Sequence, residues 1–421
     1  MIRSLKPFFR FETQNSLKLA VLSVFLPLPL LATLPTSSYA LEGHFKSAIF
    51  SQNFKNSPSE KAVNYDLRIK KQAFQENWSF ALDYQISGIK SSDLNFTNVN
   101  SDNPDRLQLF RLSDILTDSD TDYTLHRIDR LSATYSSDYY SFTLGRQALS
   151  WGNGMAFNPL DRVNPFSPIQ IDKSYKPGVD MITGQNTLEN GDQFSWFILP
   201  KRDTETKKLT HAASSYGVKL YHFAQDSITD QQWLFMKDAS EQLVGWQLSQ
   251  SRENGLWNLD LLWNYDNEIN RHSISGILNW QNSMSIKNRQ AVVFAELFYN
   301  GYGSSLTLPK IEQLSEQLLR LQSEGKVFNS NHYYTSIGMT LEVNPLLSFS
   351  GTLLSNWQDN SQLLSLQLQQ SVTENDQLLI TWQQPFGKSG SEFTGLQSED
   401  SSQNLSYSAL IYLQWQHFFR Y

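Results

Sequence analysis

The sequence predicts an all-β protein, a closed antiparallel transmembrane β-barrel of about 18 strands (16–18) with short periplasmic turns, long extracellular loops and one short loop helix. Three observations predict this fold. Segments of about ten residues alternate apolar and polar side chains along the chain. Their connections alternate between tight turns and long loops. The mature chain contains no apolar stretch near the ~18 residues that a membrane helix needs.

The composition excludes several classes of protein. The 421 residues include no cysteine, are 18% charged and 13% aromatic, and carry a net charge of −7. The lack of cysteine excludes a disulfide-stapled scaffold, thiolate nucleophiles and thiolate metal sites. The acidic balance argues against a nucleic-acid partner. We also expect no cofactor, because no phosphate-binding glycine loop or dinucleotide fingerprint occurs in the sequence.

Residues 1–40 have the pattern of a cleaved secretory signal peptide. Basic residues precede an apolar stretch from Leu19 to Leu34, and Ser38 and Ala40 supply the small residues of a cleavage site. A permanent anchor helix is the alternative, but the stretch is too short to span a membrane and is broken by prolines. Cleavage removes four basic residues and one acidic residue, so the predicted barrel, residues 41–421, keeps 30 basic and 40 acidic residues.

The strands are predicted from a period of two, which gives a strand one apolar and one polar face. In residues 63–70, for example, Val63, Tyr65, Leu67 and Ile69 alternate with Asn64, Asp66, Arg68 and Lys70. Eighteen such segments occur, and each is about as long as a tilted strand that crosses a bilayer. They begin near residues 43, 62, 77, 123, 139, 178, 193, 214, 229, 243, 256, 272, 289, 332, 347, 361, 376 and 407.

The connections sort by parity, which is typical of outer-membrane barrels. Every connection from an even to an odd strand is tight, such as Lys287-Asn288 and Asn344-Pro345. The long connections, near 89–122, 150–177, 202–213, 300–331 and 386–405, all leave an odd strand. A soluble β-sandwich would also alternate, but it gives no reason for this sorting.

A barrel follows physically because backbone groups in hydrocarbon must all be paired, so a sheet can span a membrane only when it is closed. With about 18 strands the ring leaves room for an aqueous lumen, whose lining should be polar. The last segment places Leu413, Trp415, Phe419 and Tyr421 on one face. It resembles the C-terminal signal by which the barrel assembly machinery recognises its substrates, with Tyr421 where Phe is commonest.

The stretch from Gly145 to Gly178 is rich in proline and glycine, so we expect the connection 150–177 to be a stiff loop that folds into the lumen and narrows it. Its motifs are Gly145-Arg146-Gln147, Trp151-Gly152, Asn158-Pro159-Leu160-Asp161 and Asn164-Pro165. They resemble those of alginate-export-like porins and related exported barrels. The resemblance covers about thirty-five residues and implies a channel or an export pore, without a substrate.

Two sets of charged residues are candidates for the lining. The first would line the constriction: Arg146, Asp161, Arg162, Asp172, Lys173, Lys176 and Asp180. The second lies on the polar phase of the strands and would face the lumen: Asp66, Arg68, Lys70, Asp83, Lys219, Asp260, Glu296 and Glu342. The alternative is that the loop charges form ion pairs that fix the loop to the wall, and we favour it for most single residues. Strict alternation would aim Arg146 at lipid unless the strand has left the apolar band or a bulge at Gly145 turns it inward.

The connection 300–331 predicts a helix of about four turns over residues 309–324, because Ile311, Leu314, Leu318 and Leu321 recur at helical spacing. Such a helix could cap the mouth, plug the lumen or bind a partner, and packing against the rim of the barrel is the simplest role. Enzymatic activity is not expected. The seven histidines are scattered, and the best acid–base candidate, His126 near Asp129, is more readily explained as a hydrogen-bonded wall residue.

The sequence therefore predicts an exported protein of the Gram-negative outer membrane that passes small hydrophilic solutes passively through a barrel held in lipid. An export pore for a polysaccharide or other polymer, working with periplasmic partners, is one alternative. A barrel enzyme or surface-binding protein is the other. A homo-oligomer is left open.

Overall fold

The computed structural model describes residues 41–55, 58–92, 103–224, 228–399 and 406–421. The predicted signal peptide, residues 1–40, lies outside the described residues. The strands are β1 (Leu41–Phe54), β2 (Glu60–Gln75), β3 (Trp78–Ser91), β4 (Ser113–Asp118), β5 (Asp122–Ser136), β6 (Tyr140–Gln147), β7 (Val179–Thr187), β8 (Gln193–Leu199), β9 (Ser215–Phe223), β10 (Thr229–Asp238), β11 (Glu241–Arg252), β12 (Gly255–Asp266), β13 (Arg271–Ile286), β14 (Arg289–Tyr299), β15 (Tyr333–Asn344), β16 (Leu347–Asn356), β17 (Ser361–Ser371), β18 (Asp376–Phe386) and β19 (Tyr407–Arg420).

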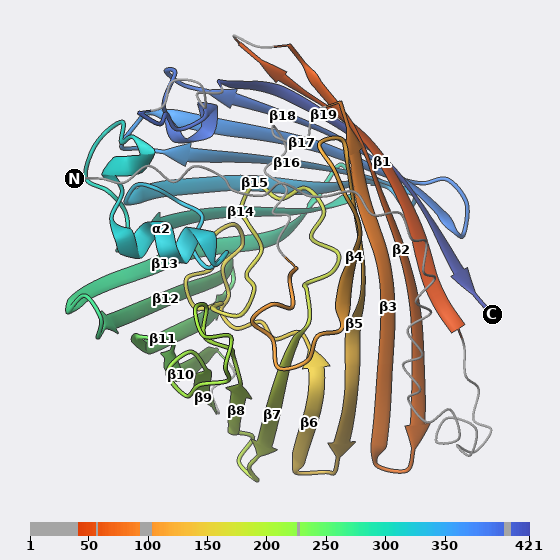
Figure 1. Ribbon diagram of the computed structural model, residues 1–421, viewed down its shortest axis with the longest axis vertical. Helices are drawn as coiled ribbons and strands as arrows, with labels where there is room; N and C mark the ends of the chain where they lie inside the picture. The colour runs from red at the N-terminus through yellow and green to blue at the C-terminus, as the bar shows by residue number, and fades with distance from the viewer. Residues whose placement is uncertain (1–40, 56–57, 93–102, 225–227, 400–405) are drawn as a thin grey trace, which may run out of the picture. The chain divides into compact units, whose positions relative to one another are not determined.

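These strands form one closed antiparallel barrel (Figure 1). Each strand pairs with its neighbours, and β19 pairs with β1 from Glu42↔Arg420 to Phe54↔Tyr407, which closes the ring. One edge of β5 pairs with β3 along most of its length. The other edge is shared, because residues 131–136 pair with β6 and residues 123–127 pair with the short strand β4. The barrel wall therefore has 18 strands, with β4 as an added segment that the sequence did not predict.

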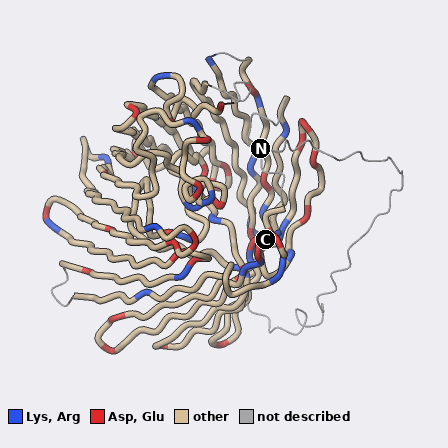
Figure 2. Tube along the Cα trace, turned by 60° about the vertical axis from the view of Figure 1, so that its left-hand side comes forward, with Lys and Arg blue, Asp and Glu red and all other residues tan. Residues whose placement is uncertain are grey.

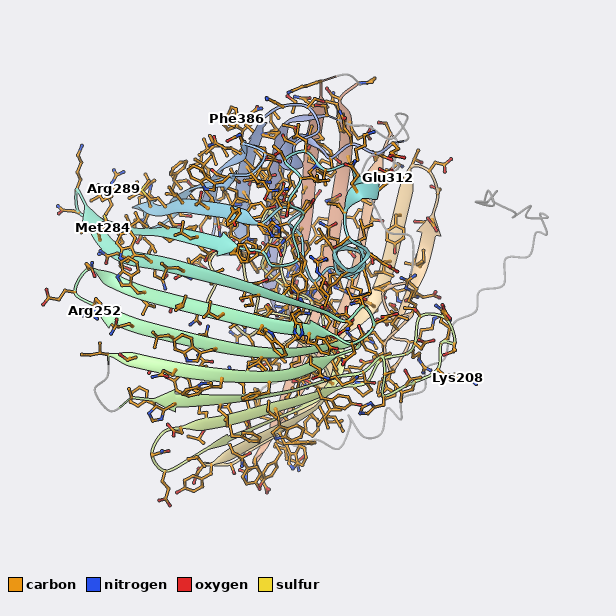
Figure 3. The ribbon with its side chains drawn as sticks, turned by 90° about the vertical axis from the view of Figure 1, so that its left-hand side faces the viewer. Lys208, Arg252, Met284, Arg289, Glu312 and Phe386 are labelled. Carbon is orange, nitrogen blue, oxygen red and sulfur yellow. The ribbon has the colours of Figure 1, made fainter. Side chains whose placement is uncertain are left out.

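The predicted fold class is confirmed. Each of the eighteen predicted strand starts lies within two residues of an observed one. The tight turns and long loops also separate as predicted: Arg252 and Arg289 lie beside tight turns at one end of the strands, whereas Lys208 and Glu312 lie in long loops at the other end (Figure 3). Lys287 and Asn288 have φ values of 49° and 64°, which suit a two-residue hairpin turn that follows the twist of its strands.

The two faces of the strands differ as a barrel in lipid requires. On β12, Trp257, Leu261 and Trp263 point outward and are 38%, 40% and 37% exposed, whereas Asn258 and Asp260 point inward and are buried. The outward row predicted for the last strand is likewise exposed at Leu413, Trp415 and Tyr421. Charged residues of both signs are interspersed along the chain (Figure 2).

The inward face is less uniformly polar than the sequence predicted. The segment between β6 and β7 crosses the interior of the ring (Figure 1). It packs against buried apolar residues of the wall to form two core clusters. The first contains Trp151, Leu160, Val163, Val179, Met181, Phe197, Leu199, Leu234, Met236, Leu243 and Leu262. The second contains Phe157, Ile277, Phe298, Tyr334, Leu354 and Leu363. Part of the lumen is therefore a packed core.

The loop helix is shorter than predicted. Instead of residues 309–324, α2 spans Glu316–Ser323, and a 3₁₀ turn, η2 (Ile311–Gln313), precedes it. Leu314 is extended, with φ −70° and ψ 149°, and the Ser315 hydroxyl accepts a hydrogen bond from the Leu318 amide, so the α-helix begins only after Ser315. Apolar spacing alone did not reveal this cap.

The helix packs on its own connection and contacts the ends of β11 and β12 through polar side chains. Leu314, Leu318 and Leu321 bury against Tyr302, and the Gln317 amide donates to Glu241 on β11 at 3.0 Å. A second 3₁₀ turn, η3 (Glu392–Thr394), lies in the connection after β18. Among the described residues, no helix is long and apolar enough to cross a membrane.

Candidate functional site

The interior segment between β6 and β7 is held by stacked and edge-on aromatic rings. Trp151 meets Phe197 of β8 edge-on, with 5.1 Å between ring centroids. Phe157 stacks on Phe298 of β14 at 4.8 Å. Such pairs contribute about 0.5–1.5 kcal/mol beyond the burial of their area. The segment is therefore packed against the wall.

Two carboxylates predicted to face the lumen also hold this segment. Glu296 accepts hydrogen bonds from three successive backbone amides, those of Met155 at 2.7 Å, Ala156 at 3.1 Å and Phe157 at 2.8 Å. Asp260 accepts one from the Asn153 amide at 3.0 Å. Both carboxylates point inward, and both are bound by the loop.

Arg146 points into the protein and is 2% exposed. Gly145 has a φ of +117°, a conformation that L side chains rarely adopt, and the ladder between β5 and β6 continues without a register shift. The turn at Gly145 therefore breaks the alternation that would have aimed Arg146 at lipid. The Arg146 guanidinium pairs with Asp180 at 2.8 Å and with Asp105 at 2.9 Å.

Asp161 and Lys176 form a buried ion pair within the interior loop, with 2.6 Å between oxygen and nitrogen. Lys176 also donates to the carbonyl of Leu149 and the hydroxyl of Ser150. Burial raises the pKa of the Asp161 carboxyl and lowers the pKa of the Lys176 ammonium, and the attraction between the two partners opposes both shifts. Lys176 thus joins the end of the loop to its beginning, at Leu149 and Ser150, and to its middle, at Asp161.

The remaining loop charges are distributed between wall and lumen. Arg162 is buried and pairs with Glu241 of β11. Asp172 accepts from Lys46 of β1 at 2.6 Å. Lys173 is exposed, and its ammonium lies 3.5 Å from the Pro168 carbonyl oxygen. Six of the seven predicted constriction residues therefore form ion pairs, and two of these pairs, Arg162–Glu241 and Lys46–Asp172, join the loop to the wall.

The other predicted lumen residues fall into two groups. Four lie on β2 and β3 and contact one another, other wall residues or the loop: Asp66 with His44, Arg68 with Asp129 and Asp83, and Lys70 with the Tyr175 hydroxyl. Lys219 lies over the ring of Trp151 at 5.5 Å, whereas Glu342 is exposed near the end of β15.

Several residues at the site were not predicted. Tyr175 of the loop stacks on His44 at 5.1 Å, and three cations lie over its ring: Lys46 at 5.3 Å, Arg68 at 4.5 Å and Lys70 at 4.2 Å. A lone loop tyrosine gives no sequence signal for such a role.

The sequence indicated Asp129 only as a possible acid–base partner of His126. The His126 ring instead contacts the Tyr84 hydroxyl at 3.2 Å, and Asp129 pairs with Arg68, Arg127 and Arg130. The register shift between β3 and β5 at Asp83/Tyr84 leaves Asp129 without a direct strand partner. The described residues contain no group of three or more acidic or histidine side chains that could hold a metal ion.

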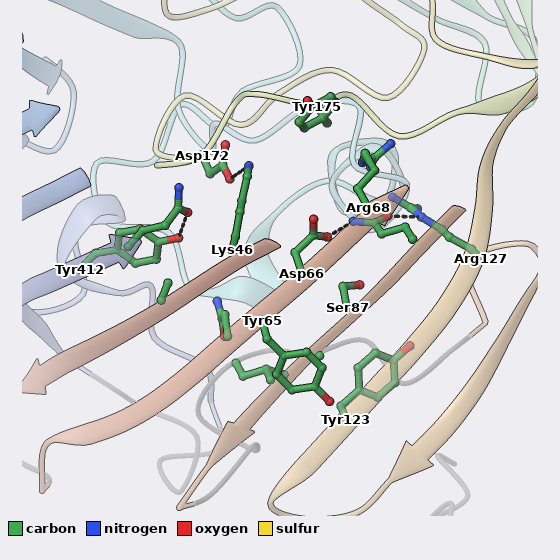
Figure 4. Close-up of a pocket in the computed structure, with 16 residues that line it drawn as sticks. Lys46, Tyr65, Asp66, Arg68, Ser87, Tyr123, Arg127, Asp172, Tyr175 and Tyr412 are labelled. Atoms are coloured by element: carbon green, nitrogen blue, oxygen red, sulfur yellow. Dashed lines mark hydrogen bonds and ion pairs between the residues drawn. The ribbon is translucent and has the colours of Figure 1, made fainter. Parts of the chain in front are cut away.

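Within the described part of the chain, two large open spaces border the loop in the lumen. The inner chamber, of about 400 Å³, lies between β1, β2, β3, β5 and β19 and the loop residues Asp172 and Tyr175. Figure 4 shows Lys46, Asp66 and Arg68 pointing into this space beneath Tyr175. The outer vestibule, of about 1150 Å³, lies toward the long loops. Asn64 and Ile89 line both spaces, so the two adjoin along β2 and β3.

Several solved outer-membrane proteins have a fold similar to this closed 18-stranded barrel. Three solved structures illustrate the likeness. OpdK of Pseudomonas aeruginosa is 10% identical with a TM-score of 0.52, and the match covers 91% of this chain and 99% of that one. OccAB2 of Acinetobacter baumannii is 10% identical with a TM-score of 0.55, covering 91% and 98%.

The third is a BenF-like porin of Pseudomonas fluorescens Pf-5, which is 10% identical with a TM-score of 0.51 and covers 91% and 99%. OpdK has also been solved with vanillate. Neither a protein-family model nor a curated protein sequence matches this chain. At 10% identity, the likeness is one of fold.

Proposed function

We propose that this protein is an outer-membrane channel for the passive passage of small hydrophilic solutes. The observation that carries the proposal is the pair of adjoining spaces in the lumen, lined by polar side chains of the wall on one side and by the interior loop on the other. The fold it shares with porins, including one solved with vanillate, supports the proposal. On this view the segment 150–177 is the constriction.

Channel activity is tested with the purified mature chain, residues 41–421, in planar lipid bilayers. We expect a stable open current. Replacing residues 166–173 with a short Gly-Ser linker should raise the single-channel conductance, because this part borders the chamber and lies outside the two core clusters. Shortening the exposed stretch 204–208 is the matched control and should leave the conductance unchanged. A chain that folds in detergent but conducts no current would overturn the proposal.

We further infer that residues 1–40 are a cleaved signal peptide, that the barrel lies in the outer membrane, and that the assembly machinery recognises the strand ending at Tyr421. The support for the last point is that β19 closes the barrel on β1, so its partner edge stays open until assembly is complete. The motifs that resemble those of alginate-export-like porins do not indicate a particular solute. Homo-oligomers are tested by cross-linking the purified protein.

A further inference from the structure

The route through the barrel changes in chemistry along its length. On the inward face of β1, the chamber is lined by Lys46 and Ala48, and the vestibule by Phe50, Gln52 and Phe54. Asn64 on β2 lies where the two spaces meet. A solute that moves from the outer mouth inward therefore meets aromatic rings and amides before it meets charges.

The described lining of the vestibule offers no cation to an incoming solute, because none of these residues is Lys or Arg. Its two lining carboxylates are bound by the protein: Glu60 accepts from Ser92 at 2.9 Å, and Glu392 accepts from the Asn356 amide at 3.0 Å.

The cations that line the chamber, Lys46, Arg68 and Arg127, are each paired with a carboxylate. Lys46 pairs with Asp172 at 2.6 Å, and Arg68 and Arg127 pair with Asp129 at 2.7 Å and 3.1 Å. Arg130 shares Asp129 at 2.6 Å, and Asp66 and Asp83 lie beside this cluster. Three arginines thus face three aspartates. Because channel selectivity for ions comes from rings of uncompensated charge, this lining gives an ion little preference by sign.

Aromatic rings and amides are what the route offers instead. The rings are Phe50, Phe54, Phe328, Phe393 and Tyr407 in the vestibule and Tyr65, Tyr123, Tyr175 and Tyr412 in the chamber. The amides are Gln52, Asn64, Gln322, Asn329 and Gln383 in the vestibule and Gln85 and Gln414 in the chamber. A ring face accepts the C–H face of a solute, and an amide oxygen accepts from hydroxyl groups. In the vestibule the amide oxygens serve this purpose, because the NH2 groups of Gln52, Gln322, Asn329 and Gln383 already donate within the protein.

We propose that the preferred solutes of this channel are uncharged polyhydroxylated molecules, that is, small saccharides. The inference rests on the proposed channel function and names its substrate class. The ring faces take the apolar faces of the sugar, and the amides take its hydroxyls. Each of these contacts is weak alone. Weak contacts suit a channel, because the solute must leave its binding site in order to pass through.

The test compares D-glucose with D-glucuronate, which keeps the pyranose ring and carries a carboxylate at C6, in proteoliposomes that contain the mature chain. We expect glucose to enter at least several-fold faster than potassium glucuronate. In bilayers, a potassium chloride gradient should give a zero-current potential near zero, and maltose should reduce the current in a concentration-dependent way. Glucuronate entry as fast as or faster than that of glucose, or strong anion selectivity, overturns the inference and leaves the channel function standing. If bilayers show no current and the proteoliposomes do not swell with either solute, the channel function itself is overturned.

Variants test the role of the rings. Phe50→Ala and Phe328→Ala should each weaken the maltose block by about two- to tenfold, as expected for one aromatic contact. Phe50→Tyr keeps the ring and should keep the block. Phe74→Ala is the matched control, because this side chain is 59% exposed and lines neither space. Variants that migrate as folded barrels in unheated gels but block like the parent chain contradict the proposed role of the vestibule.

Discussion

Replacing Glu296 with alanine should loosen the interior loop without unfolding the barrel. The substitution leaves three backbone amides of residues 155–157 without their acceptor. A buried donor without a partner costs about 1–3 kcal/mol. Water and relaxation of the loop recover part of this cost, so we expect docking of the loop to weaken by about 3 kcal/mol, which is roughly a hundredfold in the population of the released loop. Glu296→Gln keeps one acceptor oxygen and should cost about half as much.

Two measurements report the release. Trypsin should cut the segment 162–176 up to about a hundredfold faster in Glu296→Ala, because cleavage follows the open population when opening is fast. In bilayers the variant should show frequent current steps where the parent chain gives a steady level. Glu342→Ala removes an exposed carboxylate of the same predicted set and should change neither measurement. Unchanged cleavage and a steady current in Glu296→Ala would refute this account of loop docking.

Two other predictions follow from single residues. Burial raises the pKa of Glu392 to about 7, from an ordinary value of 4.5. The neutral form therefore contributes stability that is fully present below pH 4.5 and is lost as the pH rises through 7, by about 3 kcal/mol at most. Urea unfolding at pH 5.5 and 8.5 should show the loss, and Glu392→Gln should remove it. Gly145→Ala should cost about 2 kcal/mol or more, because its φ of +117° is strained for alanine and the added Cβ would collide with the Leu131 carbonyl oxygen. The yield of folded barrel in unheated gels measures this cost, and a normal yield would show that Gly145 is not needed to aim Arg146.

The sequence predicted the barrel wall closely because two local rules act on every strand. A strand between lipid and an interior must alternate, and hairpin turns such as Lys287-Asn288 need residues that tolerate positive φ. Neither rule predicts strand β4. Ser113–Asp118 has six residues and pairs only with β5, so neither length nor alternation marks it.

The site was predictable only in part because its partners are distant in sequence. The charged residues themselves were found, but Glu296 binds amides about 140 positions away and Arg146 binds Asp105 at 41 positions. No spacing rule connects such groups. Tyr175 was missed for the same reason, since only the fold brings β1 and β2 to its ring.

The strands that break alternation decide where the lumen stays open. Phe197 and Leu199 on β8, Leu243 on β11 and Leu262 on β12 put apolar side chains on the inward face, and all four are buried against the loop or beside it. On β1, β2 and β19 the inward positions beside the chamber include polar and charged residues instead, such as Lys46, Asp66 and Gln414. Apolar residues of the loop gain most by burial against the apolar arc, at roughly 25 cal/mol per Å² removed from water. The loop therefore docks on one side of the ring, and the polar arc opposite is left as the passage.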